Sequence, residues 1–267
     1  MSANTKSLKT RIKSVNSTLH LTNAMGLVAS SKMRKANIAM NAGKQYESAV
    51  CSVVDLLTSV PECSKSPFMR EYAGGKTKLI VIAGDRGLAG GYNANVFRTV
   101  RDFGEAEVVP IGKRACERYG KEFVSSEKFS SADAFKLAKQ LCEQFEDGEF
   151  ERLGIVTTNY VSMMTQTPEI KWVLPLKRAE NAQSTAAVFE PDERTILDIA
   201  VPEYLSGVIV SCVRESFASE VAARRMAMDS AGKNARQMID SLQLEYNRAR
   251  QGAITQEITE IVAGAGN

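Results

Sequence analysis

A glycine-rich segment at residues 84–93, GDRGLAGGYN, follows a short apolar run and precedes an expected helix. Backbone N–H groups in such a position hold phosphate in many nucleotide-binding proteins. The segment matches neither G-x-x-x-x-G-K-[ST] nor G-x-G-x-x-G, so a nucleotide site is disfavoured. Two alternatives stay open on the sequence alone. One is a tight strand-to-helix turn fixed by Asp85 and Arg86, and the other is an exposed contact loop.

Histidine and cysteine are too sparse for most catalytic chemistry. His20 is the only histidine, which excludes multi-His metal sites and most His-based catalysis. The five cysteines are odd in number, widely spaced and without a C-x-x-C pair, so we expect reduced thiols and neither disulfides nor zinc. No metal, cofactor or catalytic set is predicted. The cysteines are Cys51, Cys63, Cys116, Cys142 and Cys212.

The first 46 residues contain eight basic residues and no acidic one. Helix surfaces usually mix both signs, so this is either a solvated face or a face for an acidic protein, nucleic acid or anionic lipid. No aromatic residue precedes Tyr46, which disfavours single-stranded nucleic acid, and the net charge is only +3. The basic residues are Lys6, Lys9, Arg11, Lys13, Lys32, Arg34, Lys35 and Lys44.

A second polar group lies near the C-terminus, within residues 248–261. Arg250, Gln251, Thr255 and Gln256 could bond the backbone or carboxylates of a partner, or they could form an ordinary polar helix end. Three methionines in the N-terminal segment, Met25, Met33 and Met40, fit helix packing better than chemistry.

The two ends of the chain should form long helices. No proline occurs before Pro61 or after Pro202, and proline costs about 3 kcal/mol inside a helix. Apolar or small residues alternate at spacings of four and three, which predicts an antiparallel coiled coil of the two ends; two separate helices in a bundle are the alternative. One seam is Leu8, Ile12, Val15, Leu19, Thr22, Gly26, Ala29, Met33, Ala36 and Met40. The other is Val221, Met228, Gly232, Ala235, Ile239, Leu242, Tyr246, Ala249 and Ala253, interrupted by Arg225.

The middle of the chain alternates expected strands and helices, which predicts a mostly parallel, Rossmann-like α/β domain. Residues 61–75 form the entry linker. The strands are expected at 78–83, 107–112, 153–158, 170–176 and 186–189, and the helices at 93–103, 114–121 and 132–145. The predicted division is therefore a helix over 1–60, an α/β domain over 76–190 and a helix over 204–267.

Three segments together resemble the gamma subunit of bacterial F-type ATP synthase. They are residues 8–36, LKTRIKSVNSTLHLTNAMGLVASSKMRKA; residues 82–96, IAGDRGLAGGYNANV; and residues 219–228 with 246–261, SEVAARRMAM and YNRARQGAITQEITEI. The resemblance implies a non-catalytic rotor shaft without a cofactor, which couples rotation of a membrane c-ring to conformational change in catalytic beta subunits. A basic coiled-coil nucleic-acid-binding protein is the alternative. The implied partners are the alpha, beta and epsilon subunits and the c-ring, without nucleic acid.

The resemblance also assigns contact residues. Arg250 and Gln251 match the pair that meets loops of beta, and Met25 with the loop of Asp85, Arg86 and Gly87 matches positions facing an acidic region of beta. That region would also meet the basic residues Lys32, Arg34 and Lys35. Glu190 matches a position near the c-ring. Since no transit peptide is recognised, the implied location is peripheral, at the cytoplasmic face of a bacterial plasma membrane.

Overall fold

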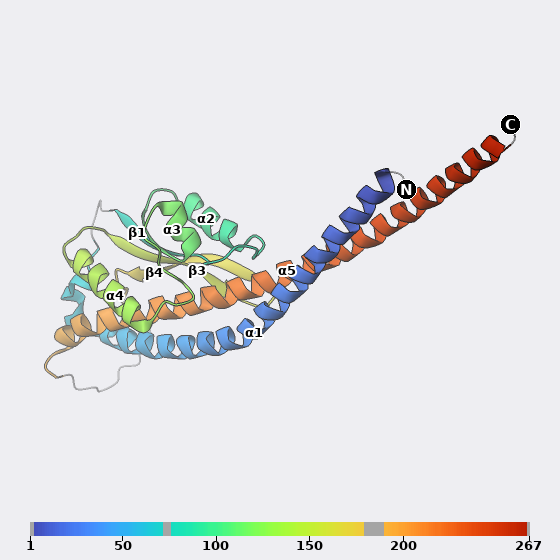
Figure 1. Cartoon of the computed structure of the whole chain (residues 1–267). Coiled ribbons are helices and arrows are strands. Elements are labelled where there is room, and N and C mark those ends of the chain that lie inside the picture. The colour runs from blue at the N-terminus through green and yellow to red at the C-terminus, as the bar shows by residue number, and fades with distance from the viewer. Residues whose placement is uncertain (1–2, 72–75, 179–189, 266–267) are drawn as a thin grey trace. The chain divides into compact units, whose positions relative to one another are not determined.

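The computed structural model describes residues 3–71, 76–178 and 190–265. These residues belong to two compact units. Unit 1 combines residues 1–30 with 224–267, and unit 2 comprises residues 31–223. Two long helices, α1 (Ala3–Ser59) and α5 (Glu193–Ala265), contribute to both units (Figure 1). The long helices predicted from the proline-free ends are confirmed.

In unit 1, α1 and α5 pack along the predicted seam. Gly26 faces Met228, while Gly232 faces Leu19 and Thr22, so the two helices run antiparallel. Every seam side chain of α5 from Met228 to Ala253 is buried or half-buried, and the small residues let the backbones approach. Arg225, which breaks the pattern, is half-buried and donates a hydrogen bond to the hydroxyl of Ser30. One polar contact thus accommodates the charge at the seam.

Unit 2 contains a four-stranded sheet of order β2-β1-β3-β4. The strands are β1 (Thr77–Ile82), β2 (Glu107–Ile111), β3 (Arg152–Tyr160) and β4 (Gln166–Leu174). β1 pairs in parallel with β2 and β3, whereas β4 pairs antiparallel with β3. The mostly parallel sheet is therefore confirmed. The β4 strand begins four residues earlier than position 170, and the strand expected at 186–189 lies outside the described residues.

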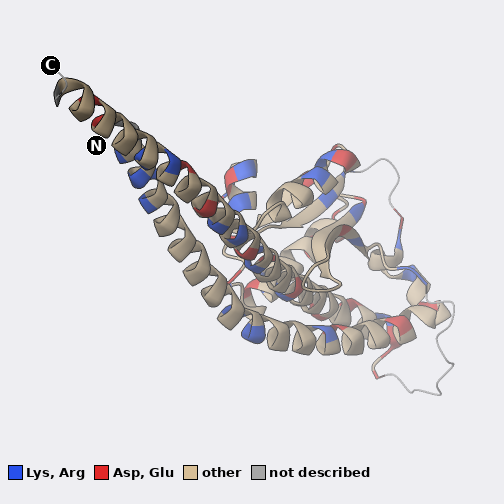
Figure 2. Cartoon of the chain, turned by 90° about the vertical axis from the view of Figure 1, so that its right-hand side faces the viewer, with Lys and Arg blue, Asp and Glu red and all other residues tan. Residues whose placement is uncertain are grey.

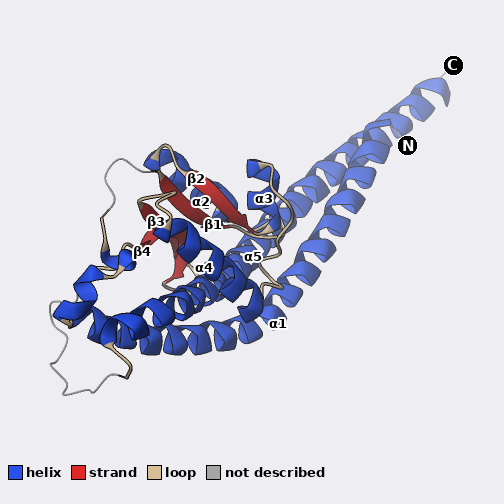
Figure 3. Cartoon of the chain, turned by 90° about the vertical axis from the view of Figure 1, so that its left-hand side faces the viewer, coloured by secondary structure: helices blue, strands red, loops and turns tan. Residues whose placement is uncertain are grey.

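Helices cover both faces of this sheet (Figure 3). Ile80 and Ile82 of β1 pack in one core with α4 (Ser131–Glu146), α1 and α5. Leu79 and Val81 point the other way and pack against α2 (Tyr92–Phe103), beside α3 (Lys113–Tyr119). Since successive side chains of a strand alternate between faces, a strand buried on both sides must be apolar throughout. This explains the continuous apolar run of β1.

The expected linker after α1 is partly a packed segment. It contains two short 3₁₀ helices, Pro61–Lys65 and Pro67–Met69. Phe68 is buried and its ring stacks on Phe145 of α4, with centroids 6.2 Å apart. The segment therefore contributes to the core of unit 2.

The expectation that the C-terminal helix begins after Pro202 is wrong. α5 begins at Glu193, and Pro202 lies inside it. Asp192 caps the start, since its carboxylate accepts hydrogen bonds from the N–H and hydroxyl of Thr195 at 2.9 and 2.8 Å. Proline inside a helix costs about 3 kcal/mol, but burying one large aliphatic side chain contributes about 1.5–3 kcal/mol. Leu197 and Leu205, which flank Pro202, are both fully buried and offset that cost.

One stretch of α5 is long and apolar enough to cross a bilayer by length and composition alone. However, 61% of that stretch is buried inside the fold, as expected for a core helix. Buried apolar residues of α5, such as Leu197 and Val208, pack in one core with the sheet of unit 2.

Candidate functional site

The loop after β1 is held in place by the carboxylate of Asp85. Its Oδ1 accepts hydrogen bonds from the backbone N–H groups of Lys113 and Ser126, each at 3.0 Å. Its Oδ2 accepts from the hydroxyl of Ser125 at 2.6 Å and the N–H of Glu127 at 3.1 Å. Asp85 therefore ties the loop to the start of α3 and to residues 125–127.

The electrostatics of Asp85 agree with a positioning role. Burial acts to raise the pKa of Asp85, but the hydrogen bonds from Ser125 and from three backbone N–H groups outweigh it and lower the pKa. The ionised carboxylate is thus the stable form at neutral pH, and both oxygens are used within the chain. Of the two alternatives for this loop, the structure supports a turn fixed by Asp85, with the side chains of Arg86 and Leu88 exposed.

Arg86 and Lys32 are brought together by a residue that the sequence analysis did not identify. The Nη2 of Arg86 lies 3.6 Å from Oε2 of Glu127, while Nζ of Lys32 pairs with Oε1 of the same carboxylate. Glu127 thereby joins α1 to the loop after β1. The side chain of Arg86 is still 64% exposed, so it remains accessible. Since Glu127 lies 95 residues from Lys32, no local pattern could indicate this pair.

The rest of the loop exposes an apolar side chain and uses its first N–H internally. Leu88 is 63% exposed and has a positive φ of 60°, which is uncommon for a residue with a side chain. Gly87 lies beside the guanidinium of Arg114. The N–H of Gly84 donates to Oδ1 of Asn93 at 2.9 Å, so this group serves the turn and not a phosphate.

The basic face of α1 is partly neutralised within the chain. Figure 2 shows Lys and Arg, and no acidic residue, along the first part of α1. Lys44 lies 2.6 Å from Glu215 and Lys32 pairs with Glu127, so acidic residues distant in the sequence neutralise these two charges. Arg34 and Lys35 are exposed and form no ion pair within the described part of the chain. They remain the better candidates for an acidic partner.

Arg250 and Gln251 lie on the exposed surface of α5 in unit 1. Their side chains form no hydrogen bond or ion pair with residues 3–71, 76–178 or 190–265. The neighbouring seam residues Ala249 and Ala253 are half-buried. Beyond Ala253 the helix exposes a row of apolar side chains at helical spacing: Ile254, Ile258, Ile261 and Val262. This part of α5 therefore presents both polar and apolar groups outward.

The structure does not gather the remaining predicted residues into the same site. Met25 is half-buried on α1 in unit 1. The loop of Asp85 belongs to unit 2, and so does Glu190, which is exposed just before α5. The predicted contact residues thus form several surfaces, not one catalytic centre.

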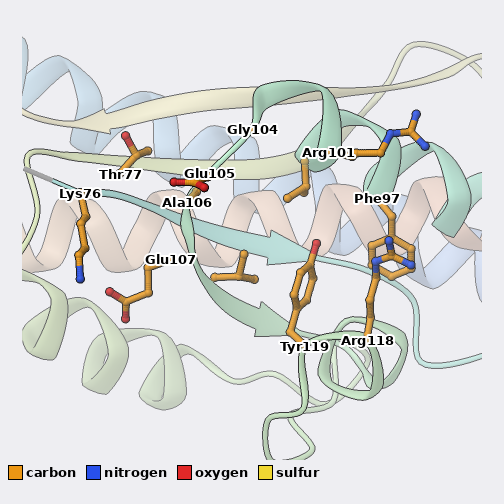
Figure 4. Close-up of a pocket in the computed structure, with 12 residues that line it drawn as sticks. Lys76, Thr77, Phe97, Arg101, Gly104, Glu105, Ala106, Glu107, Arg118 and Tyr119 are labelled. Carbon is orange, nitrogen blue, oxygen red and sulfur yellow. The ribbon is translucent and has the colours of Figure 1, made fainter.

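A pocket of about 900 Å³ is lined by residues of α2, β2 and α3 and of the start of β1, and none of the predicted contact residues lines it (Figure 4). Phe97 and Tyr119 meet edge to face at 6.3 Å between centroids, and the guanidinium of Arg118 lies 4.9 Å above the ring of Phe97. Basic and acidic side chains both line it, among them Lys76 and Glu105, so it favours neither sign of ligand. This pocket depends on the packing of separate elements, and sequence patterns do not reveal it.

Within the described ranges, no group of three or more His, Cys, Asp or Glu side chains could hold a metal ion. The buried thiols are also poor nucleophiles. Burial raises the pKa of Cys142 and of Cys212 to about 12, so both stay protonated at neutral pH.

Comparisons with known proteins agree with each other. A family model described as ATP synthase matches residues 4–266. The chain is 41% identical over 283 aligned positions to the ATP synthase gamma chain of Ruminococcus albus, covering 99% of each.

Two solved structures share the fold at low identity. A chain of the Euglena gracilis mitochondrial ATP synthase, in a structure of OSCP, F1 and c-ring, has a TM-score of 0.69 and 15% identity, covering 97% of this chain and 93% of its own. A chain of the Tetrahymena thermophila mitochondrial ATP synthase central stalk and c-ring has a TM-score of 0.64 and 20% identity, covering 79% of this chain and 99% of its own.

Proposed function

The chain belongs to the gamma chain family of ATP synthases, and we propose that its outward-facing residues meet the alpha, beta and epsilon subunits and the c-ring of such a complex. A gamma chain is the rotor of the central stalk and a non-catalytic subunit. This membership leaves the nucleic-acid-binding alternative without support. The proposed location is peripheral, at the cytoplasmic face of a bacterial membrane, through the complex.

We propose three contact surfaces on this rotor. The first is Arg250 with Gln251 on α5, directed at loops of beta. The second is the face of Arg34 and Lys35 with the loop of Arg86, all in unit 2, directed at an acidic region of beta; Met25, in unit 1, is a separate proposed contact with beta. The third is Glu190, directed at the c-ring.

The observation that supports the first surface best is the exposure of Arg250 and Gln251 without any internal partner in the described residues. A guanidinium binds a carboxylate with two parallel hydrogen bonds, and the amide of glutamine both donates and accepts. The guanidinium and the amide can stabilise one conformer of a partner only if they are not already bonded within their own chain. Here the narrow seam at Ala249 and Ala253 keeps the helix pair thin, so the two side chains project outward.

The test replaces both residues with alanine in the assembled complex. Since hydrogen bonds to charged groups contribute about 1.5–3 kcal/mol, we expect Arg250→Ala with Gln251→Ala to lower ATP turnover about tenfold or more. The subunit should remain folded, because neither side chain packs in the seam. Turnover, assembly and helicity are measured together.

The chain offers a matched control on the same helix. Arg236 and Gln237 are also an adjacent, exposed Arg-Gln pair in unit 1, but the family resemblance assigns them no contact. Arg236→Ala with Gln237→Ala should therefore leave turnover near wild type. Equal turnover in both double variants would contradict the proposed contact, and lost helicity in the Arg250 variant would show a structural role instead.

A further inference from the structure

The end of β3 lacks a strand neighbour on one side. β1 pairs with β3 only as far as Val156, whereas β4 pairs with β3 through Tyr160. The backbone groups of Thr158 and Tyr160 that face away from β4 therefore need other partners, because unpaired buried backbone groups are costly.

Side chains of α5 provide these partners. The N–H of Thr158 donates to Oγ of Ser216 at 3.1 Å, and the N–H of Tyr160 donates to Oε1 of Glu215 at 2.9 Å. The hydroxyl of Ser219 donates to the carbonyl of Thr158 at 3.1 Å. One face of a helix thus replaces a missing strand.

A chain of hydroxyl groups completes the junction. Thr157 Oγ1 donates to the carbonyl of Cys212 at 3.2 Å, and it lies 2.9 Å from Oγ of Ser216. Because the proton of Thr157 is used for that carbonyl, Ser216 donates to Thr157 and accepts from Thr158. The hydroxyls of Thr157 and Ser216 then have consistent roles, whereas the buried Oγ1 of Thr158 has no hydrogen-bond partner among the described residues.

The serines and threonines of the junction are buried, and the junction is joined to two further helices. Thr157, Thr158, Ser216 and Ser219 are each at most 2% exposed. The hydroxyl of Tyr92, at the start of α2, donates to the carbonyl of Ser216 at 3.0 Å. Nζ of Lys44 on α1 lies 2.6 Å from the same Glu215 oxygen that accepts from β3. Water cannot easily replace the hydrogen bonds of the buried serines and threonines.

Apolar packing and hydrogen bonds resist different motions. Apolar contact opposes separation, but it is not directional, so a helix can turn about its axis at low cost. Hydrogen bonds weaken steeply when their angle changes. Because the bonds from Glu215, Ser216 and Ser219 point in set directions from one face of α5, rotating the helix would break them together.

We propose that Ser216 and Ser219, with Glu215, Thr157, Thr158 and Tyr160, form a clamp that transmits torque between the sheet of unit 2 and α5 in the working rotor. This inference rests on the proposed function. The clamp residues are positioning residues, since they act by holding α5 and touch no nucleotide.

The test uses complexes reconstituted into vesicles, in which ATP hydrolysis and ATP-driven ion pumping are both measured. Thr157→Val keeps the side-chain volume and removes the hydroxyl, while Ser216→Ala removes the acceptor of Thr158. One lost hydrogen bond of about 1 kcal/mol makes opening of the clamp about fivefold more frequent. For each variant we therefore expect near-normal ATP hydrolysis with a clear loss of ions pumped per ATP. Hydrogen exchange at the amide of Thr158 should rise by a similar factor in Ser216→Ala.

Two variants separate torque transmission from general packing. Ser211→Ala removes a serine hydroxyl on the same helix that is equally buried but has no hydrogen-bond partner among the described residues, so pumping per ATP should not change. Thr157→Ser keeps the hydroxyl and should restore the pumping that Thr157→Val loses. Should Ser216→Ala fail to assemble, the isosteric Thr157→Val decides the question.

Normal pumping per ATP in Thr157→Val, with the hydroxyl demonstrably gone, would overturn the clamp while leaving the proposed function intact. An equal loss in Ser211→Ala would also overturn it, since packing alone would then explain the effect. If instead the wild-type chain did not support any ion pumping in the reconstituted complex, the proposed function itself would fail.

Discussion

The same two helices are held by different forces in the two units. In unit 1, α1 and α5 meet along a seam of small and apolar residues such as Ala29, Ala235 and Ile239. In unit 2 they share an apolar core with the sheet, and an ion pair of Glu47 with Lys171 and a buried hydrogen bond from Thr158 to Ser216 attach them to it as well. The contacts along the seam are mostly apolar and nondirectional, whereas in unit 2 directional hydrogen bonds and ion pairs are added to the apolar packing.

This difference assigns separate tasks to the two units. Two paired helices bury only one stripe each, so most of their side chains in unit 1 face outward and are available to a partner. Leu27 and Val28, for example, are 73% and 54% exposed. Unit 2 has helices on both faces of a sheet and buries its core fully. We therefore expect stability to reside mainly in unit 2, while unit 1 serves mainly for partner contact.

The largest effect should come from breaking unit 2 at a glycine. Gly112 has a φ of 96°, and an added Cβ would lie 1.9 Å from the carbonyl oxygen of Ala83. We expect Gly112→Ala to reduce the free energy of unfolding of unit 2 by more than about 4 kcal/mol, from backbone strain plus the clash. Fluorescence of Trp172, the only tryptophan, follows unit 2 during denaturation.

Gly104 is the matched control for this change. Its φ is also positive, at 106°, but an added Cβ would meet nothing within 4 Å. Gly104→Ala should therefore lower the free energy of unfolding only by the backbone strain, about 1–3 kcal/mol. Similar losses in both variants would show that the close approach of Gly112 to Ala83 does not matter.

An intermediate effect should distinguish the two cores. Leu205 is fully buried against the sheet in unit 2, and Leu242 is 4% exposed in the seam of unit 1. Leu205→Ala should lower the free energy of unfolding by about 3 kcal/mol or more. Leu242→Ala should lower it by about 2 kcal/mol, because two paired helices can move together and fill part of the cavity. Urea denaturation of each variant, read by Trp172 fluorescence and by helical circular dichroism, gives the comparison. A larger loss for Leu242→Ala would reverse our assignment of stability.

The smallest effect concerns Asp85 and depends on pH. Its pKa is lower in the folded state than in the unfolded chain, so its stabilising contribution is complete above about pH 4 and is lost as the pH falls through the folded-state pKa. At pH 7 we expect Asp85→Asn to lower the free energy of unfolding by about 1–2 kcal/mol; this range already allows for the partial exposure of the carboxylate to solvent. The stability difference from wild type should narrow below pH 4. A difference independent of pH would contradict the role of the charge.

Local patterns were sufficient for much of the fold but not for α5. The seams predicted both long helices, because heptad spacing needs only neighbouring residues. The rule that proline ends a helix failed at Pro202, where burial of Leu197 and Leu205 outweighs one lost hydrogen bond. The cap at Asp192 was present in the sequence as a signal, and recognising it would have placed the helix start correctly.

The sequence likewise indicated only some properties of the predicted contact residues. Arg250 and Gln251 were identified through the family resemblance, and the structure shows them exposed. Asp85 was also identified, yet its carboxylate turns inward to Lys113 and Ser126. Whether an acidic side chain faces a partner or its own backbone depends on which loop the fold places beside it.

The sequence by itself determined the long helices, their seam, the alternating strands and the family. All of these can be recognised from spacings of a few residues or from contiguous segments. Only the tertiary structure decided which charges are neutralised and how α5 is held. Lys32 meets Glu127 and Thr158 meets Ser216 across 95 and 58 positions of chain. In the sequence, Ser216 cannot be distinguished from any other polar residue of a helix. Its role arises because the end of β3 has no strand neighbour on the side of α5. That is a property of the packed fold and not of any local pattern.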